Sequence, residues 1–361
     1  MSAGGRKAVL VLGMHRSGTS ALARLLNLCG AALPEGLVEA AADVNAAGFW
    51  EARALLALHD EILEAAGGSW HDLRALDAGW FAGAPARAFR ARLGALLASE
   101  YGKAPLLLVK DPRLCRLLPL WRPVLAELGI EPLVVLAVRH PLEVAASLRA
   151  RDGFGEGKAL LLWLRHVLAA EHASRGMRRA FVTYEQMLAD APGTVERLGR
   201  ELELDWPRPP ETVAAEMAAF LSPALRHHEC DADEVLGNSA VPWEVREAYR
   251  WHIAAAAGEA PGDGLDAIAA DLAVAEPLFG GALAALEDAA RTRAAELRHW
   301  IGSAVERYEA IVTLRAYIEH QQREIDALAA HARAIESSRM WRALAPVRGV
   351  VRRLRGRGEV A

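Results

Sequence analysis

Short apolar runs alternate with segments of helical spacing over the first half of the chain. The apolar runs are 8–12, 106–109, 133–138 and 180–183. Both faces of each run are apolar, which is typical of strands buried in a parallel sheet. The spacing of apolar residues predicts helices over 19–29, 51–66, 87–100, 142–149 and 158–174. This alternation predicts an α/β domain with a mainly parallel sheet flanked by helices, in which ligands bind at the carboxyl ends of the strands.

A second pattern begins near Leu297 and becomes regular further on. Apolar residues then recur at alternating spacings of three and four, as in a coiled-coil seam with one polar position, Gln321. We expect a helical or coiled-coil segment over 286–338 that forms a homo-oligomer through 297–336, and a polar seam residue often fixes the register. A single helix packed on the preceding domain is the alternative. The seam positions are Ile311, Leu314, Ile318, Gln321, Ile325, Leu328, Ala332 and Ile335.

The last segment, 339–361, combines arginines with an apolar stripe at helical spacing. A basic amphipathic segment can lie on an anionic membrane surface or bind an acidic partner, and we expect such a contact through 339–357. Pro346 interrupts the helical pattern, and a disordered, solvated tail is the alternative. The arginines are Arg339, Arg342, Arg348, Arg352, Arg353, Arg355 and Arg357, and the stripe is Trp341, Leu344, Val347, Val351 and Leu354.

Composition narrows the class of protein. Of the 361 residues 53% are apolar, which excludes disorder as the main state, and the net charge of −4 gives no overall attraction to nucleic acid. The three widely spaced cysteines exclude a disulfide framework and favour a reducing compartment. We expect no signal peptide from the short run 8–12, and the stretch 159–170 cannot span a bilayer. We therefore expect a cytoplasmic protein that can lie peripherally at the inner face of the membrane.

The chain places a glycine-containing turn between its first strand and first helix. The turn reads Gly13-Met-His-Arg-Ser-Gly-Thr-Ser20, with the glycine spacing of a P-loop. In this context backbone N–H groups and the helix dipole favour a bound phosphate, whereas the alternative is a plain turn that contains glycine. Thr19 stands where a P-loop has lysine, which disfavours ATP hydrolysis and kinase chemistry. Arg16 supplies the cation instead and can bind two oxygens of a phosphate or sulfate.

These residues resemble the loop of sulfotransferases that use PAPS (3′-phosphoadenosine 5′-phosphosulfate), in particular bacterial members that begin G-M-H-R-S-G-T-S. The resemblance implies a P-loop-like sulfotransferase fold over 1–285, and it covers about residues 9–228. It implies that the loop holds the 5′-phosphosulfate of PAPS, a co-substrate that is used without a metal. The loop residues concerned are His15, Arg16, Ser17, Gly18, Thr19 and Ser20.

The same family binds the 3′-phosphate of PAPS with an arginine at a strand end and a serine eight residues later. Arg139 and Ser147 have this spacing, and Pro141 between them is favourable at the start of a helix. In similar bacterial proteins the stretch around Arg226 approaches the nucleotide, although a loop with two histidines is an equal alternative. The Tyr184-Glu185 pair resembles another family element, which we interpret as mainly structural.

Sulfuryl transfer to a hydroxyl needs cations at the donor and a base at the acceptor. Arg16 is the candidate cation for the leaving phosphate, and Lys110 is a second candidate, although a lysine at a strand end is also common on surfaces. Glu51 ends a sequence that resembles the N-x-x-G-F-W-E element of bacterial members and is the candidate base. Its alternative role is to cap a helix, and His59 and Asp60 are the alternative bases.

The tryptophan content suggests that the hydroxyl acceptor is a carbohydrate or another small molecule. Two other functions remain open from the residues alone. The first is a small-molecule kinase with a degenerate P-loop, which would leave the second phosphate site unexplained. The second is a coiled-coil tethering protein that retains a nucleotide domain without catalysis.

Overall fold

The computed structural model describes residues 5–39, 48–221 and 232–355. The chain divides into two compact units, Met1–Gly281 and Ala282–Ala361. The first unit contains the sheet and the surrounding helices, and the second contains the greater part of one long helix and the basic tail.

Four parallel strands form the sheet of the first unit in the order β2-β1-β3-β4. β1 (Arg6–Leu12) lies between β2 (Leu106–Lys110) and β3 (Ile130–Val138), and β4 (Arg178–Thr183) forms one edge. β3 and β4 start earlier than the apolar runs predict, because residues outside those runs, Glu131 in β3 and Arg178 in β4, also belong to the paired strands. Arg178 of β4 forms an ion pair with Glu131 of β3 at 3.3 Å.

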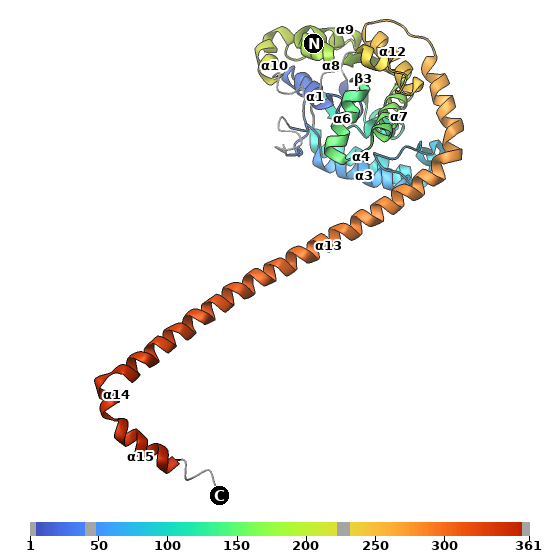
Figure 1. Cartoon of the computed structure of the whole chain (residues 1–361). Coiled ribbons are helices and arrows are strands. Elements are labelled where there is room, and N and C mark those ends of the chain that lie inside the picture. Colours follow the sequence, from blue (N-terminus) through green and yellow to red (C-terminus); the bar gives the residue numbers. More distant parts are fainter. Residues whose placement is uncertain (1–4, 40–47, 222–231, 356–361) are drawn as a thin grey trace. The chain divides into compact units, whose positions relative to one another are not determined.

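Helices cover both faces of this sheet (Figure 1). This explains why the predicted strands are apolar on both faces. Leu10 of β1 belongs to a core with α3 (Arg53–Ala65), α4 (Ala84–Tyr101) and α5 (Leu114–Glu127). Val9 and Val11 belong to the opposite core, with α1 (Thr19–Leu28), α8 (Tyr184–Ala189) and α9 (Ala191–Glu201). The α/β class with a parallel sheet flanked by helices is therefore confirmed.

A third core combines two predicted helices with helices from residues 232–281, for which we predicted no elements. It joins α6 (Pro141–Asp152) and α7 (Glu156–Ser174) to α11 (Ala232–Leu236), α12 (Trp243–Ala256) and the first turns of α13 (Gly264–Ser337). Trp163 lies fully buried in this core, and Glu276 of α13 forms an ion pair with Arg165 of α7 at 2.8 Å. Three short helices complete the described part of this unit: η1 (Ala78–Ala82), η2 (Pro210–Val213) and α10 (Ala214–Phe220).

The second unit continues α13 and ends in α14 (Arg339–Ala343) and α15 (Ala345–Arg355). The expected long C-terminal helix is confirmed. The expected interruption of the tail helix at Pro346 is confirmed, because α14 ends at Ala343 and a new helix, α15, begins at Ala345. Pro346 lies in the first turn of α15, where its missing N–H has no helical partner in any case. Among the described residues, α13 alone is long and apolar enough to cross a membrane, through an 18-residue window of mean hydropathy 1.5.

Candidate active site

The turn between β1 and α1 is shaped by two glycines. A Cβ on Gly13 would lie 2.6 Å from the carbonyl oxygen of Ala137, and the Gly13 N–H donates to Cys115 Sγ at 3.1 Å. Gly18 is the N-cap of α1 with a φ of 80°, and a Cβ there would collide with the ring of Tyr184. Arg16 also has a left-handed φ, 69°, which is strained for a residue with a side chain and is typical of functional sites. The turn thus presents the first N–H groups of α1, which lack helical partners, as an anion site.

The Arg16 guanidinium joins the two predicted phosphate sites. Its Nε donates to the Oγ of Ser147, on α6, at 2.7 Å. Arg139 donates from Nη1 to the carbonyl oxygen of Arg16 at 3.2 Å. Burial, followed by the positive charges of Arg151 and Arg139, lowers the pKa of Arg16. A bound anion would stabilise the charge that these two arginines disfavour on Arg16.

A buried carboxylate holds Arg139 in place. Glu143, one helical turn further along, accepts from Arg139 Nε at 2.7 Å and pairs with Nη2 at 2.7 Å. The Arg139 guanidinium also lies over the ring of Tyr184 at 4.4 Å, and Trp163 Nε1 donates to the Arg139 carbonyl at 3.2 Å. The sequence reasoning missed Glu143, although its i+4 spacing from Arg139 was a usable signal. It also missed the contact between Arg139 and Tyr184.

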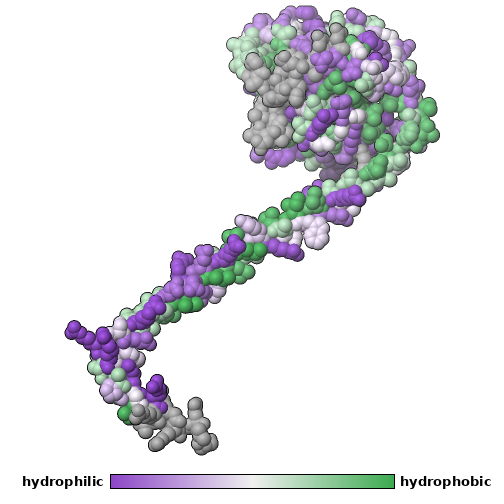
Figure 2. All heavy atoms as spheres, viewed as in Figure 1, coloured by the Kyte–Doolittle hydropathy of each residue, from purple (hydrophilic) through white to green (hydrophobic). Residues whose placement is uncertain are grey.

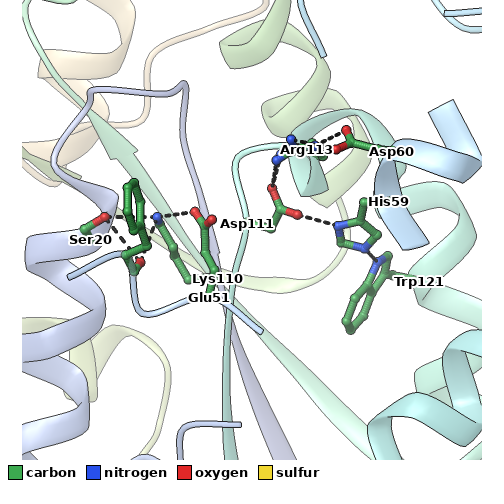
Figure 3. Close-up of polar contacts among 9 residues, drawn as sticks. Ser20, Glu51, His59, Asp60, Lys110, Asp111, Arg113 and Trp121 are labelled. Atoms are coloured by element: carbon green, nitrogen blue, oxygen red, sulfur yellow. Dashed lines mark hydrogen bonds and ion pairs between the residues drawn. The ribbon is translucent and has the colours of Figure 1, made fainter. Parts of the chain in front are cut away.

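We call the turn of residues 13–20 the phosphate loop. Lys110, at the end of β2, contacts both this loop and the candidate base Glu51 (Figure 3). Its Nζ donates to Glu51 Oε1 at 2.5 Å, to Ser20 Oγ at 3.0 Å and to the Phe49 carbonyl at 3.1 Å. The Lys110 and Glu51 side chains are 3% and 7% exposed, so Lys110 is not the surface lysine of the alternative interpretation. Burial raises the pKa of Glu51, and the attraction of Lys110 offsets only part of that effect.

The helix that follows Glu51 starts later than predicted. α3 begins at Arg53 with Ala52 as its N-cap, so Glu51 lies before the helix and its carboxylate binds Lys110. The capping role considered for Glu51 is therefore wrong. The side chain is held by an ion pair across the sheet edge instead.

The two alternative bases are engaged in a neighbouring buried network (Figure 3). His59 bonds through Nδ1 to Asp111 Oδ2 at 2.7 Å, and its Nε2 lies 2.9 Å from the Nε1 of Trp121. An indole nitrogen can only donate, so His59 Nε2 is the acceptor and Nδ1 carries the proton. Asp60 pairs with the Arg113 guanidinium, at 2.6 Å from its Nε.

Asp111 and Arg113, in the turn after Lys110, form an ion pair at 3.1 Å. Burial opposes the charge of Asp111, but His59 and Arg113 outweigh it and hold the pKa of that carboxyl below its usual range. This network fixes the turn directly after Lys110 and engages both His59 and Asp60, whereas Glu51 binds Lys110 instead.

The remaining loop residues lie in different surroundings. Ser17 and Thr19 are buried, and Ser20 contacts Lys110. The half-buried ring of His15 lies 4.4 Å from the ring of Trp70, and burial lowers the pKa of His15 well below the usual value.

Arg226, the remaining predicted nucleotide contact, lies outside the described residues. Among the described residues, no group of three or more His, Cys, Asp or Glu side chains is arranged to hold a metal ion.

Comparison with known proteins identifies the family. A model of the sulfotransferase family matches residues 8–208, more than half of the chain, and the chain belongs to this family. A search of curated proteins found no match.

Three solved structures illustrate the similarity at low sequence identity. The sulfotransferase domain of the Synechococcus PCC 7002 olefin synthase is 17% identical, covering 69% of this chain and 96% of that chain, with a TM-score of 0.38. A sulfotransferase from Mycobacterium tuberculosis H37Rv is 16% identical, covering 69% and 77%, with a TM-score of 0.35. Retinol dehydratase in complex with retinol and PAP is 17% identical, covering 67% and 69%, with a TM-score of 0.30.

Proposed function

We propose that this sulfotransferase moves a sulfuryl group from PAPS to a hydroxyl acceptor, with Glu51 as the general base. The observation that carries this proposal is the set of contacts made by Lys110. One ammonium group binds both Ser20, in the first turn of α1, and Glu51, so the base lies at the phosphate loop.

The arginines around the loop fit a donor with two phosphate groups. Arg16 lies in the loop itself, where the 5′-phosphosulfate would bind, and it contacts Ser147, which we assign with Arg139 to the 3′-phosphate. Arg139 is fixed by Glu143, so its charge is positioned before any ligand arrives. A guanidinium that is already oriented loses less entropy when it binds a phosphate.

The proposed reaction uses these groups in one displacement. The acceptor hydroxyl gives its proton to the Glu51 carboxylate while its oxygen forms a bond to sulfur. The bond between sulfur and the bridging phosphate oxygen breaks, and adenosine 3′,5′-bisphosphate leaves. Arg16 and Lys110 stabilise the negative charge that develops on the bridging oxygen. The raised pKa of Glu51 makes it a stronger base than a solvated carboxylate.

For the acceptor we propose a carbohydrate. Trp70 contacts His15 of the loop and lies 5.9 Å from Phe154, with the Arg151 guanidinium 5.5 Å from its ring. Half-buried aromatic rings with a few polar groups are typical of small-molecule sites. Substitution of Trp70 by alanine should raise the KM for a sugar acceptor, whereas the matched substitution Trp80→Ala, in a different aromatic group beside α4, should not. Equal effects of both substitutions would count against an acceptor site at Trp70.

For the localisation we propose the cytoplasm, with the tail at the anionic inner face of the membrane. In the tail Met340 and Val347 are exposed, and Arg348 lies 3.8 Å from the Trp341 ring centroid. Apolar and basic side chains together favour an anionic lipid surface. The full chain should float with vesicles that contain phosphatidylglycerol but not with vesicles of phosphatidylcholine alone. Flotation with neither would overturn the membrane contact.

The donor is tested by calorimetric titration with adenosine 3′,5′-bisphosphate and, separately, with ATP and magnesium. Tight binding of the bisphosphate alone supports the proposal. Preference for ATP would favour the kinase alternative. Binding of neither would favour a tethering protein, and deletion of 303–361 would then abolish function while Arg16→Ala would not.

A further inference from the structure

The second unit exposes an unusual amount of apolar surface along one helix. Figure 2 shows apolar residues that run beside hydrophilic ones along the extended part of α13. The seam consists of residues 311, 314, 318, 321, 325, 328, 332 and 335. Its large apolar members range from 43% exposed at Ile335 to 70% exposed at Leu328. A helix is stabilised mainly by packing of its apolar face. We therefore expect a helix with such an exposed apolar seam to pack against a partner.

We propose that the seam binds the seam of a second copy of this chain, as a parallel, in-register, two-stranded coiled coil. The residue types at the seam positions argue for two parallel strands. Isoleucine occupies the first position of three successive heptads, at 311, 318 and 325, and leucine occupies the fourth position at 314 and 328. β-Branched residues at the first position with leucine at the fourth favour parallel dimers over larger assemblies.

Gln321 argues for the parallel, in-register arrangement. In that arrangement Gln321 lies opposite its own copy, and two amide groups can donate to and accept from each other. In an antiparallel pair, fourth positions lie opposite first positions, which are apolar here, and a buried amide would have no such partner. In the single chain the Gln321 amide donates to Glu324 Oε2 at 3.1 Å, so its hydrogen-bonding group already lies along the edge of the seam.

The flanking positions are compatible with this pairing. In a parallel dimer each seventh-position residue faces the fifth-position residue of the next heptad on the other strand. The facing pairs are Ala310 with Arg315, Tyr317 with Gln322, Glu324 with Ala329 and His331 with Glu336. None of these pairs places like charges together, and the last is attractive when the histidine is protonated. Charge therefore does not oppose the self-pairing that the seam favours.

The end of the helix coincides with the end of the seam. Ile335 is the last seam residue, α13 ends at Ser337, and Ser338 caps the next helix by accepting from the Trp341 N–H. Upstream of Ile311 the exposed apolar residues are Leu297, Ile301, Val305 and Tyr308, whose spacing is less regular than heptads. We therefore confine the paired segment to 311–335, which is about 37 Å of helix.

Sedimentation equilibrium of the full chain tests the stoichiometry. We expect a mass of twice 38.9 kDa, and Ile318→Asp with Ile325→Asp should shift the protein to the monomer mass. The matched control is Ala316→Asp with Ala330→Asp, which adds the same charges to the opposite face of the same helix and should leave the dimer intact. Circular dichroism and thermal unfolding of the first unit verify that each variant is folded. A monomeric wild type, a larger assembly, or monomers from both double variants would overturn the proposal.

Disulfide formation tests the orientation independently of the sulfotransferase assignment. Gln321→Cys should give a cross-linked dimer under mild oxidation, whereas Arg323→Cys, on the outer face, should not. A dimer in which Gln321→Cys fails to cross-link would overturn the parallel register. A full chain that is recovered only in detergent and sediments with membranes would instead indicate that α13 inserts into the bilayer.

Discussion

Arg139 offers the sharpest test of how this protein binds its donor. The structure holds Arg139 by its contacts with Glu143 and with the carbonyl oxygen of Arg16, which engage three of its five N–H groups. Two N–H groups are left for a phosphate. We predict that Arg139→Ala weakens binding of adenosine 3′,5′-bisphosphate by about 1.5–3 kcal/mol, the usual loss for hydrogen bonds to a charged group. This corresponds to roughly 10-fold to 150-fold in Kd.

The same substitution should also lower stability. The Glu143 side chain is fully buried, so removal of Arg139 takes away the counter-charge that this guanidinium gives the carboxylate in the core. Breaking a buried pair in this way destabilises by about 3–5 kcal/mol. Glu143→Gln added to Arg139→Ala removes the buried charge. The double variant should therefore recover much of the lost stability without recovering affinity.

Calorimetry with two ligands separates the two effects. Adenosine 5′-phosphosulfate has no 3′-phosphate, so its binding should be nearly the same in the wild type and in the double variant. Adenosine 3′,5′-bisphosphate should show the full loss in both Arg139 variants. Equal losses for the two ligands would refute the assignment of Arg139 to the 3′-phosphate. Recovery of affinity in the double variant would show that stability alone caused the loss.

Three further predictions concern the base and the phosphate loop. Glu51→Gln should lower kcat about 10²-fold to 10⁴-fold while the protein still binds the donor, as measured by calorimetry. Because burial raises the pKa of Glu51 and the base must be ionised, kcat/KM should fall with decreasing pH at a midpoint above about 4.3, the value for a free glutamate. Gly18→Ala should abolish binding of the bisphosphate, because its methyl group would collide with Tyr184, whereas Gly157→Ala, which has open space around it, should bind normally.

Each of these predictions has an outcome that would contradict it. Full activity of Glu51→Gln would exclude Glu51 as the base and favour the alternative bases, His59 and Asp60. If kcat/KM instead falls at a midpoint at or below the ordinary glutamate value, the effect of Lys110 on the pKa of Glu51 outweighs that of burial. Normal nucleotide binding by Gly18→Ala would mean that the loop does not hold the donor in the described conformation.

Local sequence patterns were sufficient to predict the parallel sheet and the phosphate loop. Strands β1 and β2 are short, continuous apolar runs because helices cover both of their faces, and the sequence shows this directly. Residues 206–281 gave no usable pattern. Most of the described helices there are short, and α11, α12 and the first turns of α13 pack into the third core with α6 and α7.

The contacts that define the site depend on residues far apart in the chain. Lys110 and Glu51 are 59 positions apart, and His59 and Trp121 are 62 apart. A motif resemblance pointed to Glu51, but only the packed structure shows that its carboxylate binds Lys110. Only the structure shows that Trp121 determines the tautomer of His59, because no local spacing connects an indole on α5 with an imidazole on α3.

The three partners of Lys110 have a consequence for the order in which substrates bind. All three of its N–H groups are engaged in the free protein, so a donor oxygen that binds Lys110 must replace one of them. Replacement of Glu51 would release the carboxylate to accept a proton only after the donor has bound. We therefore expect a compulsory order with PAPS first, and competitive inhibition by adenosine 3′,5′-bisphosphate against PAPS but not against the acceptor. Such an enzyme would stay idle in the presence of acceptor alone.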